Sequence, residues 1–333
     1  MADDTDTSTD REILAQVFPE RPVTSVRTVQ RGNHKQTAVV EFAEAASVVV
    51  QWSTRPAALR TEFTLAAAVR ERTSLPVPAV LAAGELDGVG YVVCERADGI
   101  DLHEAFAGLA TEHQHGLARR FGRYLAELHE AFQFEGYGRV RVADDGDAGT
   151  VAAVGVRRQQ PLRAVESSDW EAWFSAYARE GLAALPAAFD EEREAIRETL
   201  AAADLPTVPT PRLYPWDLRP GNALVADGEL TAVLDWGDPL AADAGLSLAK
   251  AEYVVCDWYV DDGASLRKAL HEGYESVRPV PTVPLAYRLV AVARSAVDSR
   301  GVVTRPGFPE REGDAAVAFH KARLAELLAE CSE

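Results

Sequence analysis

The pattern of apolar and polar positions divides the chain into a strand-rich first part and a helical second part. The first part contains short apolar runs joined by short polar connections, which favours an antiparallel sheet. These runs span residues 23–29, 37–42, 47–52, 80–85 and 91–95. Pro56 begins a helical segment that extends to about residue 73, and Thr9 is a candidate N-cap for a short helix that ends at Phe18.

Helical spacing begins after the polar turn at residues 97–99. Apolar residues recur every three or four positions over residues 112–132, which predicts an amphipathic helix. Further helices are predicted at residues 170–182, at 191–203 and over most of 244–330, with a hairpin at 213–235 and a polar, Gly-rich loop at 140–156. The chain is therefore expected to have an α+β fold with two lobes, a β-rich domain of residues 1–96 and a larger helical domain of residues 97–333. A ligand is expected in the cleft between them.

Charge and composition limit the possible partners. The net charge is −18, with 52 acidic against 34 basic residues, and only four of the basic residues are lysines, Lys35, Lys250, Lys268 and Lys321. This acid-rich, lysine-poor composition is typical of a protein from a high-salt cytoplasm, where salt screens the self-repulsion. A chain without a basic stripe is not expected to bind nucleic acid.

Cellular location is predicted from what the sequence lacks. No apolar run approaches the length of a membrane span, and the acidic first residues do not resemble a signal peptide. The three cysteines are far apart in the sequence, which favours a reducing compartment. We therefore expect a cytoplasmic protein, and the sequence does not indicate its oligomeric state.

Three oxygen-bearing side chains mark the candidate site. Asp217 lies in a loop bounded by Pro and Gly, Asn222 follows five positions later, and Asp235 ends the second apolar run of the predicted hairpin. The hairpin brings Asn222 and Asp235 to one end, and two carboxylates with an amide suit a hard cation and a phosphate ester. The alternative is an ordinary loop and turn, because Asp and Asn are common in turns.

The segments PWDLRPGN (215–222) and VLDWGD (233–238) resemble the aminoglycoside phosphotransferase family of kinase-like small-molecule kinases. Residues 75–88, 91–102 and 121–132 resemble the strand, hinge and long helix of the same family. The resemblance implies a protein-kinase-like fold and an ATP- and Mg²⁺-dependent O-phosphotransferase that acts on a small hydroxylated molecule, of the aminoglycoside, sugar or amino alcohol class. It implies that Asp217 is the catalytic base, that Asn222 and Asp235 are metal ligands, and that Glu95 lies in the nucleotide-binding hinge.

Two departures from the family pattern bear on activity. Pro215-Trp216 replaces the His-Gly that precedes the catalytic Asp, and Gln51 occupies the strand position of the phosphate-pairing lysine. The helix glutamate that normally pairs with this lysine is matched by Glu62, so a Gln51–Glu62 hydrogen bond is expected. A nucleotide- or ligand-binding pseudokinase is therefore the alternative to an active enzyme. A metal-dependent hydrolase is less favoured, because no histidine ligands accompany the acids.

Another cation could compensate for Gln51. The segment RGNHKQT (31–37) lies where the family's phosphate-covering loop lies, and its backbone amides, Arg31, His34 and Lys35 could reach phosphates. The alternative is a basic hairpin turn, since a single glycine makes a weak phosphate motif. The choice between ATP and GTP stays open.

Overall fold

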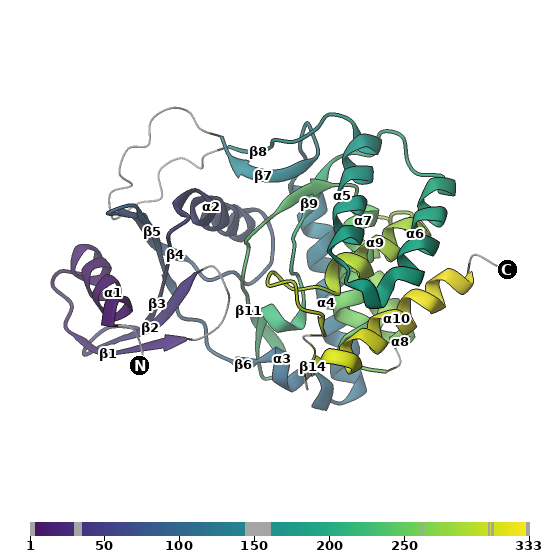
Figure 1. Ribbon diagram of the computed structural model, residues 1–333. Coiled ribbons are helices and arrows are strands. Elements are labelled where there is room, and N and C mark those ends of the chain that lie inside the picture. Colours follow the sequence, from purple (N-terminus) through teal and green to yellow (C-terminus); the bar gives the residue numbers. More distant parts are fainter. Residues whose placement is uncertain are drawn as a thin grey trace.

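A five-stranded antiparallel sheet forms the first part of the fold (Figure 1). The computed structural model describes residues 4–29, 35–143, 161–261, 263–305, 307 and 310–330. The strands are β1 (Val23–Val29), β2 (Gln36–Phe42), β3 (Val48–Ser53), β4 (Val80–Leu86) and β5 (Val89–Glu95), in the order β1-β2-β3-β5-β4. All five follow the predicted apolar runs to within two residues at either end.

One helix covers each face of this sheet, as Figure 1 shows. Helix α1 (Asp4–Val17) packs Ile13 and Leu14 against alternate strand residues such as Val50. Helix α2 (Pro56–Arg72) packs Leu59 against Val92 on the other face. Because successive side chains of a strand point to opposite faces, the residues of β2, β3 and β5 alternate between the face covered by α1 and the face covered by α2.

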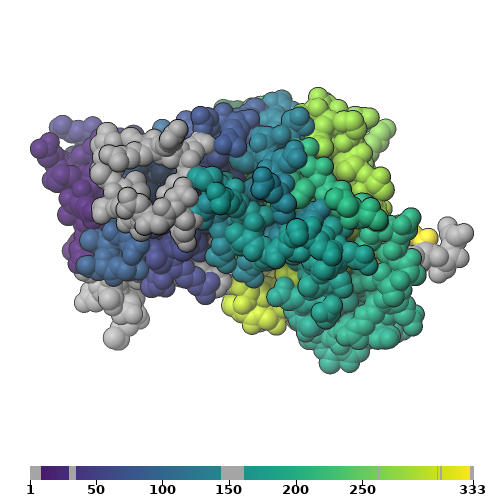
Figure 2. Space-filling view, turned by 90° about the horizontal axis from the view of Figure 1, so that it is seen from above, coloured from purple at the N-terminus to yellow at the C-terminus, as the bar shows by residue number. Residues whose placement is uncertain are grey.

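The second part is mainly helical and lies at the other end of the molecule (Figure 2). Its α-helices are α3 (Leu102–Ala105), α4 (Thr111–Ala131), α5 (Trp170–Ala184), α6 (Asp190–Ala202), α7 (Ala244–Ala251), α8 (Ala264–Glu275), α9 (Leu285–Ser295) and α10 (Gly313–Ala329). Short 3-10 helices are η1 (Phe106–Gly108), η2 (Ala187–Phe189) and η3 (Pro220–Asn222), and a π-helical turn, η4 (Glu252–Asp257), continues α7.

Helices α4 and α8 approach each other closely because glycines face each other across their contact. A Cβ atom at Gly122 would overlap the carbonyl oxygen of Leu270, and one at Gly273 would overlap the carbonyl oxygen of Arg119. The backbones can therefore touch only where no side chain intervenes. This contact holds the long helix α4 against the centre of the helical part.

Small sheets complete the second part. The strands are β6 (Ile100–Asp101), β7 (Gly138–Val142), β8 (Leu162–Ala164), β9 (Arg212–Tyr214), β10 (Ala223–Ala226), β11 (Glu229–Val233), β12 (Leu240–Ala242), β13 (Thr304–Arg305) and β14 (Arg311–Glu312). They form sheets of order β11-β10-β6, β8-β7-β12-β9 and β13-β14. Among the described residues, no helix is long and apolar enough to cross a membrane.

Two sequence predictions about secondary structure were wrong. Helix α1 begins at Asp4, so Thr9 lies inside the helix and is not its N-cap. Residues 140–142, predicted as part of a loop, belong to β7, because their backbone pairs with β8 while the two preceding residues of β7 pair with β12. Most of the remaining predicted loop lies outside the described residues.

Candidate active site

A tight hairpin positions two of the three candidate oxygen ligands. Strands β10 and β11 are joined by Asp227-Gly228, both with positive φ, as a two-residue hairpin turn requires. The backbone N–H of Leu234 donates to the carbonyl of Asn222 at 2.8 Å. Since this bond pairs Asn222 with the residue that precedes Asp235, both candidate ligands lie at the open end of the hairpin.

Asp217 lies beside this end, in the loop between β9 and η3. The Asn222 amide donates to the Asp217 carbonyl oxygen at 3.0 Å, which ties the loop to the hairpin. The Asp217 side chain is 27% exposed, and Arg219 Nε lies 3.5 Å from its Oδ1. Burial alone would raise the pKa of Asp217, but the charges of Arg219 and Lys250 and hydrogen bonds from Arg219 and Asn222 lower it below its usual value. Asp217 is thus an ionised carboxylate that can accept a proton.

Asp235 has a left-handed backbone, with φ of 61°. This conformation costs a non-glycine residue about 1–2 kcal/mol, and such strain clusters at functional sites. The Asp235 side chain is 47% exposed and so remains open to a ligand. The strained turn therefore directs a partly exposed carboxylate from the end of the hairpin.

Lys35 joins the two lobes at this point. Its ammonium forms an ion pair with Glu62 of α2 and a second one, at 3.0 Å, with Asp235 Oδ1. The side chains of Lys35 and Glu62 are only 18% and 13% exposed. Burial lowers the pKa of Lys35, but the carboxylates of Glu62 and Asp235 more than offset this and raise it. Lys35 is therefore a fixed positive charge between α2 and the hairpin.

The expected Gln51–Glu62 hydrogen bond was wrong. The Gln51 amide donates instead to Thr37 Oγ1 at 3.3 Å, across the β2–β3 pair in which Thr37 lies opposite Gln51. Glu62 forms an ion pair with Lys35 instead, because a carboxylate pairs more strongly with an ammonium than with a neutral amide. The charge that Gln51 lacks thus comes from Lys35, the residue directly before β2.

Strand parity explains how Lys35 reaches Glu62. Gln51 lies opposite Thr37 on one side and Val92 on the other, and Val92 packs under α2. Residues opposite each other in an antiparallel pair share a face, and so do residues two apart along one strand. Lys35, two positions before Thr37, is therefore on the face that α2 covers.

The side chain of Glu95 is engaged within the N-terminal part. It accepts a hydrogen bond from the Ala79 backbone N–H at 3.1 Å, lies 3.9 Å from Arg70, and is half exposed. Glu95 is the last residue of β5, within the segment that was predicted to be the hinge. Arg31 and His34, the other predicted cations of the covering loop, lie outside the described residues.

The family model of the phosphotransferase enzyme family (APH) matches residues 23–287. The chain belongs to this family. Its fold is similar to that of a crystal structure of aminoglycoside phosphotransferase APH(4)-Ia, with a TM-score of 0.63, 15% identity, and 97% of this chain and 98% of that one covered. No curated protein matches the sequence.

Two further solved structures share the kinase-like fold. One is a thermostable mutant of APH(4)-Ia in a ternary complex with AMP-PNP and hygromycin B, with a TM-score of 0.62, 15% identity and coverage of 97% and 98%. The other is the macrolide 2'-phosphotransferase MphH from Brachybacterium faecium, with a TM-score of 0.54, 18% identity and coverage of 85% and 88%. At these identities the likeness establishes the fold, and family membership makes the protein a phosphotransferase.

The sequence did not identify two cations of this phosphotransferase beside Trp216, the residue that precedes Asp217. Lys250 on α7 is 4% exposed, and its Nζ lies 4.2 Å from the centre of the Trp216 ring. The Arg294 guanidinium lies 3.9 Å from the centre of the Tyr177 ring and 5.6 Å from that of Trp216. One available signal was Lys250 itself, the sole charged residue of α7 and one of only four lysines in the chain.

Asp243 fixes the helix that carries Lys250. Its carboxylate accepts from the Gly245 backbone N–H at 2.8 Å and from the Tyr287 hydroxyl at 2.9 Å, which caps α7 and ties it to α9. Asp243 is therefore the N-cap of α7 and has a structural role. The Asp243 cap thus fixes the position of α7 and, with it, the position of Lys250 near Asp217.

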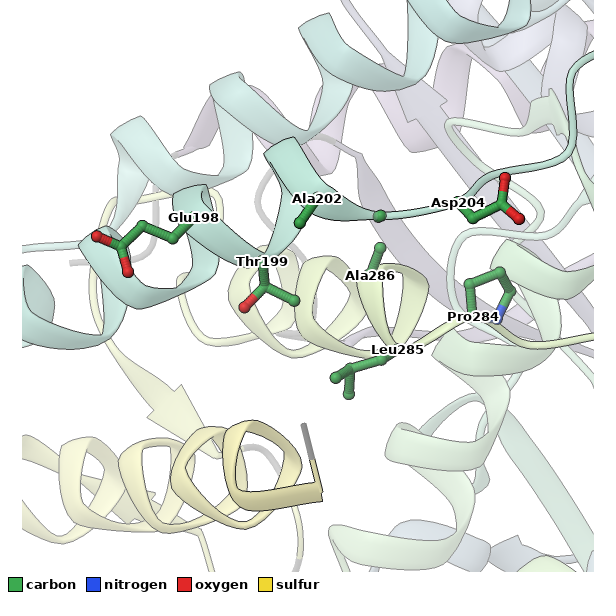
Figure 3. Close-up of a pocket in the computed structure, with 8 residues that line it drawn as sticks. Glu198, Thr199, Ala202, Asp204, Pro284, Leu285 and Ala286 are labelled. Carbon is green, nitrogen blue, oxygen red and sulfur yellow. The ribbon is translucent and has the colours of Figure 1, made fainter. Parts of the chain in front are cut away.

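A separate hollow of about 560 Å³ lies between the end of α6 and the start of α9 (Figure 3). It is lined by Glu198, Thr199, Ala202, Ala203, Asp204, Pro284, Leu285 and Ala286. None of the candidate site residues is among them. The hollow is therefore separate from the candidate site.

Proposed function

We propose that this phosphotransferase transfers the γ-phosphoryl group of ATP to a hydroxyl group of a small molecule, in a reaction that needs Mg²⁺. The observation that carries the proposal is the meeting of an ionised Asp217 with Asn222, Asp235 and the charged Lys35 at one end of a hairpin. A cytoplasmic, high-salt setting and the lobe boundary at residue 96 belong to the same proposal, on the sequence grounds given above.

Asp217 acts as the base in the proposed reaction. It accepts the proton of the acceptor hydroxyl, whose oxygen forms the new bond to the γ-phosphorus. The bond from that phosphorus to the β–γ bridging oxygen breaks, and ADP leaves with the electron pair. Positioning and charge stabilisation supply most of the rate in phosphoryl transfer.

Lys35 supplies positive charge for the phosphates. Its ion pairs with Glu62 and Asp235 hold it at the junction of the lobes, where the family pattern requires a lysine. The pseudokinase alternative was based mainly on the missing charge at Gln51. Because Lys35 forms the ion pair with Glu62 that Gln51 cannot, the geometry favours turnover.

The donor set fits a magnesium ion. Asn222 and Asp235 offer an amide and a carboxylate oxygen from adjacent positions. Mg²⁺ is usually held by one or two carboxylates together with substrate phosphates and water. When bound, it would neutralise the charge that develops on the phosphates.

The test is ADP formation over a panel of sugars, amino alcohols, aminocyclitols and hydroxy acids, with ATP or GTP and with or without Mg²⁺. We expect Mg²⁺-dependent turnover of at least one acceptor class, reduced at least a hundredfold in Asp217→Ala. The absence of turnover with every acceptor, or equal rates in the wild type and in Asp217→Ala, would disprove the proposal.

A further inference from the structure

Three cations surround the base and its neighbouring tryptophan. Arg219 and Lys250 both act electrostatically on Asp217, and Lys250 and Arg294 both contact the Trp216 ring. Trp216 directly precedes Asp217, where the family pattern has a glycine. An acceptor hydroxyl that reaches Asp217 therefore lies within the electrostatic influence of Arg219 and Lys250.

The cations are only partly neutralised. Arg219 is paired with Asp217, and Arg294 with Glu180 at 3.0 Å. Glu180 is 67% exposed, so solvent screens its charge. No carboxylate within the described ranges lies at ion-pair distance from Lys250. One positive charge is thus left over next to the base.

An unpaired buried ammonium is costly, which calls for a reason. Burial lowers the pKa of Lys250 to about 8, because desolvation and the charges of Arg219 and Arg294 together outweigh the attraction of Asp217. The cation–π contact with Trp216 compensates for only part of this cost. An anion bound beside Lys250 would offset part of this cost.

We propose that the acceptor of this enzyme is anionic, a small hydroxylated carboxylate or phosphate monoester whose negative group pairs with Lys250 while its hydroxyl meets Asp217. The inference rests on the proposed phosphotransferase function and narrows its substrate class. It runs against the overall charge of −18, which alone would favour cationic acceptors such as amines. The charges next to Asp217 outweigh the net charge of the whole chain in selecting the acceptor, because electrostatic interactions are strongest where water is excluded.

The test compares matched acceptors that differ in one charged group. Glycerol, glycerate and glycerol 3-phosphate form one series, and glucose, gluconate and glucose 6-phosphate form another, with ethanolamine and glucosamine as cationic members. Turnover is followed as ADP release and as the phosphorylated product, in the lowest salt at which the full chain remains folded by circular dichroism. We expect kcat/KM for the best anionic member to exceed that of its neutral parent at least tenfold. The carboxylate and phosphate members separate the two sources of negative charge.

Lys250→Met tests whether this residue carries the preference. We expect it to lower the ratio of anionic to neutral kcat/KM at least tenfold, chiefly through KM, and Lys250→Arg to keep part of the preference. Lys268→Met removes the same charge from an exposed position on α8 and is expected to change nothing. Preference for neutral or cationic acceptors, or an equal loss with all acceptors in Lys250→Met, would overturn the inference while leaving the phosphotransferase intact.

Calorimetric titration of the same acceptors into the ADP-bound protein tests the preference for anionic acceptors independently of the proposed phosphotransfer. If no acceptor is turned over, the proposed function fails, and binding decides the inference alone. Anionic members that bind tenfold more tightly than neutral ones in the wild type, but not in Lys250→Met, support it. Equal binding of both classes refutes it.

Discussion

Removing Lys35 and placing a lysine at position 51 of β3 instead tests the proposed role of Lys35 most directly. We expect Lys35→Met to lower kcat about a hundredfold to a thousandfold, the usual loss when one preorganised donor to a developing charge is removed. The double variant Lys35→Met/Gln51→Lys should recover at least a tenth of the wild-type rate. The reason is that residue 51 and residue 35 are on the same face of the sheet, under α2 and Glu62.

The structure sets the size of the effect. Lys35 Nζ lies 3.0 Å from Asp235 and also pairs with Glu62, whose side chain is 13% exposed. Two such interactions are worth several kcal/mol at an intermediate dielectric constant, in line with the ~3–4 kcal/mol that a hundredfold to thousandfold loss represents. Lys35→Met also leaves Glu62 without its cation, so we expect a stability loss of about 1–3 kcal/mol.

Steady-state kinetics with ATP titrated at saturating acceptor would resolve kcat from the KM for ATP. Gln51→Met is the matched control, because the bond that the Gln51 amide donates to Thr37 is neutral and its loss should change kcat less than about threefold. Chemical denaturation of each variant would show that the rates are measured on folded protein. Full activity in Lys35→Met, or a double variant no faster than the single one, would refute a relocated lysine.

Three further predictions concern the base, the buried lysine and the helix contact. Asp217→Asn should lose about 10²–10⁴ in kcat yet keep its affinity for ATP, measured by calorimetry, and retention of kcat would exclude Asp217 as the base. Folding lowers the pKa of Lys250 from 10.5 to about 8. Between these pH values the unfolded chain keeps the Lys250 proton and the folded protein loses it, so the cost of burying the charge falls as the pH rises from about 8 to 10.5. Lys250→Met should therefore raise the free energy of unfolding at pH 7 by about 1–3 kcal/mol and by much less at pH 10, as urea denaturation can show, and an equal gain at both pH values would contradict the burial cost. Gly122→Ala should destabilise the protein by at least about 2 kcal/mol through overlap with Leu270, whereas Gly116→Ala, on the same helix in open space, should stabilise it by about 0.4–1 kcal/mol; equal effects in denaturant melts would refute the close contact.

Local patterns were enough to predict most of the fold. The strands of the sheet, α2, α4 and the β10–β11 hairpin follow from alternation, helical spacing and a turn that needs positive φ, all of which act over a few residues. Errors arose where two local signals competed. A capping pattern at Thr9 suggested a later start for α1, and the polar residues around β7 concealed a strand that is stabilised by its neighbours β8 and β12.

The part of the candidate site that lies in one hairpin was predictable from the sequence. The part formed by contacts between distant segments was not. Asp217, Asn222 and Asp235 lie within one hairpin and its preceding loop, so their spacing was informative. The pairing of Lys35 with Glu62 and Asp235 joins residues 27 and 200 positions apart, and no short-range pattern encodes it. Strand parity did contain part of the answer, since it puts residue 35 on the same face as Gln51.

The two lysines near the site, Lys35 and Lys250, differ in how their charges are balanced. In a chain with a net charge of −18 and four lysines, Lys35 is at the lobe junction and Lys250 is beside the base, on either side of the region where the phosphoryl group would move. Lys35 is balanced by two carboxylates, whereas Lys250 has no carboxylate at ion-pair distance within the described part of the chain. A balanced charge suits a permanent structural and phosphate-binding role, and an unbalanced one suits a partner that arrives with the substrate. This difference between the two lysines is the physical reason to look for negative charge on the acceptor.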